Sequence, residues 1–226
     1  MAHAQEQTTV VIFGSMHLEP KEYPAYAERF EKIIEEIAPD IICSELSPEQ
    51  LEGTATCNSK PEQRDVVIPT AIRLGIPIVP IQTATADARD WETRYKTADQ
   101  SLRSQVPQRY YLEYSDHLAK KEAELWGNQM ISADYIENVQ LNEYHVFSEA
   151  RDAVENELTP ELAEMMSEWN ESFLRRILVT IETNRGQRIL IITGLWHKYW
   201  LWNKLSLYDN VSLHNLQSFR HWVSST

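Results

Sequence analysis

The first third of the chain alternates between short apolar runs and segments with helical spacing. The apolar runs are rich in β-branched residues, and each predicts a buried strand. These predicted strands are Thr8–Phe13, Ile41–Leu46 and Ile76–Ile81. The predicted helices are Tyr23–Ile37, a short helix that begins at Ser47-Pro48, and Gln63–Leu74. Strands that alternate with helices favour a parallel sheet with right-handed crossovers.

The pattern changes between residues 84 and 185, where helical spacing continues over a long stretch that contains one glycine, Gly127. The strand pattern resumes at Arg188–Thr193, followed by a predicted helix over Lys198–Leu207 and a last strand over Val211–Leu216. We therefore expect an α/β fold, with a mainly parallel β-sheet flanked by helices, in a single domain over residues 1–226. Its sheet parts cover about 8–82 and 187–217, and a central helical insertion covers about 84–185.

The composition is that of an acidic globular protein. With 21 Lys and Arg against 34 Asp and Glu, the formal net charge is −13, and 42% of the residues are hydrophobic. Binding to nucleic acid or to an anionic membrane requires a basic face, so we expect neither as a partner. A small-molecule or peptide substrate is the expected partner, and the sequence carries no signal for the oligomeric state.

Targeting and cysteine signals point to a cytoplasmic location. The beginning of the chain has no basic region, and the apolar run Val10–Phe13 is too short for a signal peptide. No stretch reaches the ~18 uninterrupted apolar residues of a membrane span. The two cysteines, Cys43 and Cys57, are too few for a disulfide scaffold, and Cys43 lies in an apolar run typical of a buried thiol.

Two predicted strands end in the same Gly-x-x-His motif. Gly14–His17 (Gly-Ser-Met-His) follows the first strand, and Gly194–His197 (Gly-Leu-Trp-His) follows the strand after the insertion. Glycine lets a strand turn sharply or take a positive φ, and the loop that follows would project the histidine over the carboxyl edge of the sheet, where α/β sheets bind ligands. Glu45 ends the second strand at the same edge, and a carboxylate there is costly unless it is paired, hydrogen-bonded or ligating.

His17, Glu45 and His197 are therefore the candidate catalytic residues, and two chemistries suit them. Two imidazoles and a carboxylate can bind a divalent metal (Mn, Zn, Co or Fe) with open positions for water, which the metal would activate. Without a metal, one histidine can serve as general base, with Glu45 orienting it.

These motifs resemble those of the superfamily that includes the TraB/PrgY pheromone-shutdown proteins, the Tiki metalloproteases, ChaN-like haem-binding proteins and erythromycin-esterase-like enzymes. The matching positions are Gly14 and His17, Glu45 and Leu46, Glu168 and Asn170, and Gly194 and His197. The resemblance implies a metal-dependent hydrolase of peptide, ester or related bonds. It also implies that Glu168 and Asn170 support the ligands.

The chain departs from the family pattern at two positions. Gln50 and Trp169 stand where the family has arginines. A guanidinium there would bind an anionic group or stabilise an oxyanion, so the departures suggest an altered substrate or chemistry. Arg175 and Arg176 follow within two turns and are candidates to substitute, although exposed helical arginines are the simpler interpretation.

Weaker signals leave alternatives open. Trp196 and Trp200 share one helical face, where they would form a substrate-binding wall for an apolar or flat ligand, or pack the helix on the sheet. The pairs Glu113/His117 and His145/Glu149 have ligand spacing on a helix but are more often solvated pairs.

Three other functions stay open. A ChaN-like haem or flat-ligand binding protein and a non-haem iron oxidative enzyme would use the same sheet edge. The third is a non-catalytic interaction domain on a decayed enzyme fold. The metal-dependent hydrolase is the leading hypothesis.

Overall fold

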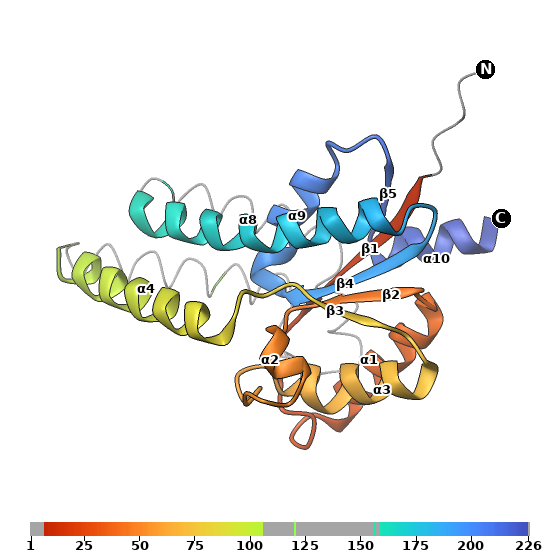
Figure 1. The fold of residues 1–226 in the computed structure, drawn as a ribbon, viewed down its shortest axis with the longest axis horizontal. Coiled ribbons are helices and arrows are strands. Elements are labelled where there is room, and N and C mark those ends of the chain that lie inside the picture. Colours follow the sequence, from red (N-terminus) through yellow and green to blue (C-terminus); the bar gives the residue numbers. More distant parts are fainter. Residues whose placement is uncertain (1–6, 106–119, 121–155, 157–158, 226) are drawn as a thin grey trace.

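The strands form one parallel sheet in the computed structural model, which describes residues 7–105, 120, 156 and 159–225. The strands are β1 (Thr8–Ser15), β2 (Ile41–Ser44), β3 (Ile78–Pro80), β4 (Arg188–Gly194) and β5 (Val211–His214). Their order in the sheet is β3-β2-β4-β1-β5, and every neighbouring pair is parallel (Figure 1). The expected α/β class is confirmed.

Helices cover both faces of this sheet. One face packs against α1 (Pro24–Ile37), the π-helical turn η1 (Gln63–Val67), α3 (Ile68–Leu74) and α10 (Leu216–Ser225). The other packs against α4 (Thr85–Gln105), α8 (Pro160–Thr183) and α9 (Leu195–Leu205). Strand residues alternate between the two cores: Val11 and Phe13 face α1, whereas Val10 and Ile12 face α8, and all four are fully buried. Such coverage of both faces is typical of parallel sheets.

The short helix α2 (Pro48–Leu51) begins as the sequence predicts. The Ser47 hydroxyl accepts a hydrogen bond from the Gln50 amide N–H, and the Gln50 side chain accepts one from the Ser47 amide N–H. This capping box fixes the turn that follows β2.

The C-terminal elements differ from the prediction in two ways. Helix α9 begins at Leu195, directly after β4, so His197 lies in its first turn rather than in a loop. The last strand ends at His214 rather than Leu216, and α10, which the pattern did not predict, follows it. Asn215 caps α10: its side chain accepts from the Ser218 N–H at 2.7 Å, and the Ser218 hydroxyl accepts from the Asn215 N–H at 3.0 Å. The capping residue Asn215 therefore ends the strand two residues earlier than the pattern predicts.

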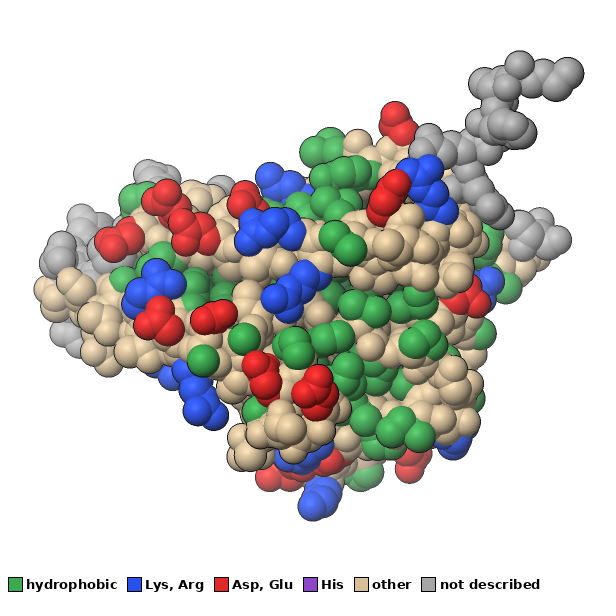
Figure 2. Space-filling view, viewed as in Figure 1, with side chains coloured by type: hydrophobic (Ala, Val, Ile, Leu, Met, Phe, Trp, Pro, Cys, Tyr) green, Lys and Arg blue, Asp and Glu red, His purple; other side chains and the backbone are tan. Residues whose placement is uncertain are grey.

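The helices α4 and α8 lie at the two ends of the predicted insertion. Most of the segment between them, including Glu113, His117, His145 and Glu149, lies outside the described residues. On the face shown in Figure 2, acidic and basic side chains are interspersed and do not form a basic patch. Of the helices that the structure describes, none combines the length and apolar character needed to cross a membrane.

Candidate functional site

The candidate site lies at the carboxyl ends of three neighbouring strands, β2, β4 and β1. Ser15 pairs with Gly194, and Ser44 pairs with Ile192, so the three strands end at nearly the same level. Because β4 lies between the other two, the residues that follow β1 and β2 reach it from opposite sides. The sheet order therefore converts three distant sequence positions into one site.

Gly194 is the point at which these residues meet. A Cβ at Gly194 would lie 2.8 Å from Nε2 of His17, 3.4 Å from Oε2 of Glu45 and 3.5 Å from Cδ2 of His197. The structure thus brings together His17, Glu45 and His197 around a position that must lack a side chain.

The two motif glycines act through their missing side chains. Gly194 has a φ of −55°, and a Cβ at Gly14 would lie 2.6 Å from Leu195 Cδ1, where α9 packs on β1. Of the two alternatives expected for these glycines, a positive φ is found at neither, and the left-handed conformation falls on His17, with φ 53°. A non-glycine residue in this region is uncommon and is held there by its surroundings.

A buried carboxylate fixes the His17 ring. Nδ1 of His17 lies 2.7 Å from Oε1 of Glu62, whose side chain is fully buried. A carboxylate accepts, so Nδ1–H donates, and the neutral ring carries its lone pair on Nε2. Within the described residues Nε2 has no hydrogen-bond partner, and 32% of the side chain is exposed. Burial lowers the pKa of His17, but the hydrogen bond to Glu62 and the charges of Glu45 and Glu62 outweigh it, so the pKa is raised.

The His197 ring is fixed from α8. Its Nδ1 lies 2.5 Å from Oδ1 of Asn170, and its ring meets the Phe173 ring edge-on, with 5.2 Å between the centroids. Nε2 of His197 lies 4.0 Å from Oε1 of Glu45. Since the Asn170 oxygen accepts from Nδ1–H, Nε2 is the atom turned towards Glu45.

Glu45 is a buried carboxylate whose two oxygens are both occupied. Oε2 accepts from the Thr193 hydroxyl at 2.8 Å and from the Gly194 N–H, and Oε1 lies 3.1 Å from Nζ of Lys60. Burial raises the pKa of Glu45, but the charges of Lys60, His197 and His17 outweigh it and hold the pKa well below its usual range. The carboxylate therefore stays ionised.

Lys60 and Glu62 are site residues that sequence reasoning missed. The Lys60 ammonium is buried and donates to Oε1 and the backbone carbonyl of Glu45 and to Oε1 of Gln82. Both residues lie in the polar run 57–65, whose composition is that of a solvated loop. The π-helical turn that follows them is a geometry often found at functional sites, but no residue pattern announces it.

The expected three-residue metal site fits this arrangement only in part. The two imidazoles fit, because each Nδ1 is held by an acceptor, as in metal-binding histidines. Glu45 does not fit, because the Lys60 ammonium 3.1 Å away already neutralises it and would repel a cation. In the part of the chain that is described, no group of three His, Cys, Asp or Glu side chains is arranged to hold a metal ion. The divalent metal stays a prediction.

The other predicted site residues are dispersed. Asn170 contacts His197, but Glu168 is exposed on α8. Trp196 is half exposed, whereas Trp200 packs against the core between the sheet and α8. Trp169 is buried in a stack with Trp91, with 4.6 Å between the ring centroids. Trp196 and Trp200 therefore differ in burial, and their role as a substrate-binding wall stays a prediction.

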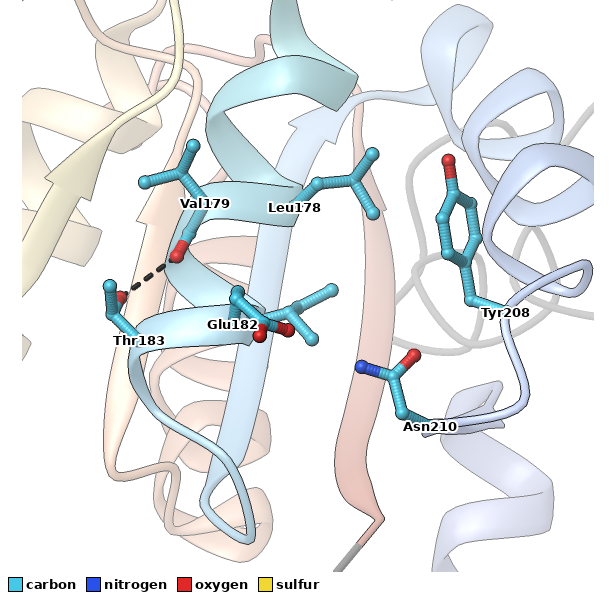
Figure 3. A pocket seen from close by; sticks show the side chains of 7 residues that line it. Leu178, Val179, Glu182, Thr183, Tyr208 and Asn210 are labelled. Carbon is cyan, nitrogen blue, oxygen red and sulfur yellow. Dashed lines mark hydrogen bonds between the residues drawn. The ribbon is translucent and has the colours of Figure 1, made fainter. Parts of the chain in front are cut away.

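An apolar groove lies elsewhere on the molecule. It has a volume of about 390 Å³ and is lined mainly by the C-terminal end of α8 and by Tyr208 and Asn210 (Figure 3). Since α8 leads into β4 and Asn210 leads into β5, the groove lies at the amino ends of the strands. It is thus at the opposite edge of the sheet from His17 and His197.

Comparisons with family models, curated proteins and solved structures give no match to this chain. The resemblance based on the two Gly-x-x-His motifs stays a prediction. The chemistry of the site is therefore argued from its geometry, in which two oriented imidazoles flank one buried carboxylate.

Proposed function

We propose that this protein is a hydrolase in which His17 acts as general base and His197 as general acid. The observation that carries the proposal is the geometry of His17. Its Nδ1 is held by buried Glu62 at 2.7 Å, and its partly exposed ring turns Nε2 towards Gly194. A fixed imidazole with a lone pair at a sheet edge suits removal of a proton from water.

The roles of the surrounding residues follow from their charges. His17 takes the proton from a water that attacks a carbonyl carbon, and Glu62 stabilises the imidazolium that forms. His197, held by Asn170, donates a proton from Nε2 to the leaving group. Glu45 stabilises the protonated form of both rings, because it is an ionised carboxylate beside both. The substrate class is a peptide, ester or related bond, as the resemblance implies.

The test is hydrolysis of a p-nitrophenyl ester and of fluorescein-labelled casein by the wild type and by His17→Gln, Glu62→Gln and His221→Gln. His221 is exposed on α10 and serves as the matched histidine control. His17→Gln should lower the rate by about 100-fold or more, the usual contribution of a general base. Wild-type rates in His17→Gln would contradict the proposal.

A metal-dependent hydrolase at the same edge is the second candidate, because both Nδ1 atoms are held by acceptors. The two candidates differ in metal content. We expect protein incubated with Mn(II), Co(II), Fe(II) or Zn(II) and then desalted to show little bound metal by plasma mass spectrometry, because Lys60 opposes a cation at Glu45. Near-stoichiometric metal that disappears in the His17→Ala/His197→Ala variant would support the second candidate instead.

A further inference from the structure

We propose that Arg176 binds a carboxylate group of the substrate, beside the His17–Glu45–His197 site. The inference rests on the proposed hydrolase function and adds a substrate class to it, namely esters or amides that carry a free carboxylate.

Arg176 is connected to the site through a chain of contacts. It is partly buried on α8, and its Nη1 donates to the backbone carbonyl of Gln82, just after β3. The side-chain carbonyl of the same Gln82 accepts from Lys60, whose ammonium pairs with Glu45. Helix α8 also carries Asn170, which holds His197 and lies six residues before Arg176, about 9 Å along the helix axis.

Of the two cations in this chain of contacts, Lys60 and Arg176, Arg176 is the one with N–H donors left for a substrate anion. Lys60 has three N–H donors, and all three are directed at oxygens of Glu45 and Gln82. Arg176 has five N–H donors, of which the Gln82 carbonyl takes one. Within the described residues no Asp or Glu forms an ion pair with Arg176. The neighbouring Arg175 is exposed, and its Nη1 lies 4.0 Å from Oε2 of Glu171.

The residue that follows the Gln82 carbonyl carries an unsatisfied buried group. The hydroxyl of Thr83, the residue after Gln82, is buried and has no hydrogen-bond partner in the described part of the chain. A buried hydroxyl of this kind is costly unless something pairs with it. A ligand oxygen at this strand end would satisfy it.

The charges around Arg176 favour a carboxylate over a phosphate. The planar guanidinium matches both anions through paired N–H bonds. The site already holds two buried acids, Glu62 beside His17 and Glu45 paired with the Lys60 ammonium. A dianion would be repelled more strongly by this arrangement than a monoanion.

The binding test observes Arg176 directly and does not require hydrolysis. The arginine Nε–H signals are followed by NMR as sodium acetate or sodium phosphate is added at constant ionic strength. The Arg176 signal, assigned by its loss in Arg176→Gln, should shift saturably with acetate and less with phosphate, and Arg175→Gln should preserve this response. No saturable shift, or an equal shift of the Arg175 signal, would overturn the site. A stronger response to phosphate would overturn the carboxylate assignment.

A kinetic comparison then links the anion site to hydrolysis. The substrates are p-nitrophenyl acetate and mono-p-nitrophenyl succinate, which differ by a free carboxylate. Arg176→Gln should raise the KM for the succinate ester relative to that for the acetate ester by about 10-fold or more, the loss of one charge-assisted contact. Equal effects on both esters would contradict a carboxylate-binding role. If the wild type hydrolyses neither ester, the general-base proposal fails on these substrates, and the acetate titration still decides the role of Arg176.

Discussion

Gly194 shows how one residue determines the geometry of the whole site. Its missing side chain leaves the space into which His17, Glu45 and His197 converge, and its N–H donates to the Glu45 carboxylate. Gly194 therefore both leaves room for the three side chains and donates a hydrogen bond to one of them. The second motif glycine, Gly14, has a different task, because it lets α9 pack closely on β1.

Replacing Gly194 with alanine should disturb the site at the His17 ring. The new Cβ would lie 2.8 Å from Nε2 of His17, and this ring cannot move without weakening its bond to Glu62. We expect a loss of about 1–3 kcal/mol in the free energy of unfolding, which is the cost of overpacking, and a changed His17 signal by NMR. Gly14→Ala is the matched control, because its Cβ meets Leu195 instead and should leave the His17 signal in place. An unchanged His17 signal in Gly194→Ala would contradict this view of the glycine.

At the residue scale, the sequence predicts the functional side chains that directly follow strands. It does not reveal the functional side chains that come from a loop. His17, Glu45 and His197 stand at strand ends in a repeated motif, and the structure brings them together. Lys60 and Glu62 come from a polar run before η1 and have no spacing relation to the motifs. Their burial depends on how the turn after α2 folds back over the sheet edge, which periodicity does not encode.

At the scale of elements, the apolar pattern predicts where the strands begin. It does not predict the order in which the strands lie in the sheet. The starts of β1, β2, β4 and β5 fall on the first residue of each predicted strand. The insertion of β4 between β1 and β2 is a property of long-range packing, since no local residue pattern specifies a neighbour. The same limit explains α9, whose first turn follows β4 without a polar break in the sequence.

Helix α10 is an element that the pattern missed, and it contributes to the core. Phe219 is 2% exposed and packs in the cluster that covers the α1 face, whereas Val223 on the same helix is 47% exposed. Phe219→Ala should lower the free energy of unfolding by about 3–5 kcal/mol, measured by urea denaturation. Val223→Ala should change it by less than about 0.5 kcal/mol. Equal effects of the two substitutions would show that α10 does not pack as described.

At the scale of the whole molecule, an ionised pair is buried where three strands end. Lys60 and Glu45 are 7% and 3% exposed, and each depends on the other for its charge to be tolerated. The pKa of the Glu45 carboxyl is lowered from 4.5, so its contribution to stability is present above that pH and is lost as the pH falls through the folded pKa. Acid should therefore weaken the molecule through this site.

Removing one partner of this pair should cost more than removing both. Lys60→Met leaves Glu45 buried without its counter-charge and should lower the free energy of unfolding at pH 7 by about 3–5 kcal/mol. The Glu45→Gln/Lys60→Met variant removes both charges and should recover part of that loss, as measured by urea denaturation. A double variant less stable than Lys60→Met alone would argue against the pair as the stabilising unit.

The most direct test of the proposed chemistry is the pH titration of His17 by long-range ¹H–¹⁵N NMR, in the wild type and in Glu62→Gln. The structure predicts a proton on Nδ1 of the neutral ring and a pKa above the ordinary value of 6.5, because the hydrogen bond to Glu62 and the nearby carboxylates outweigh burial. Glu62→Gln should lower that pKa, so His17 becomes a competent base at lower pH. A His17 pKa that is the same in both proteins, or a neutral ring protonated on Nε2, would contradict the assignment of His17 and Glu62 as the general base.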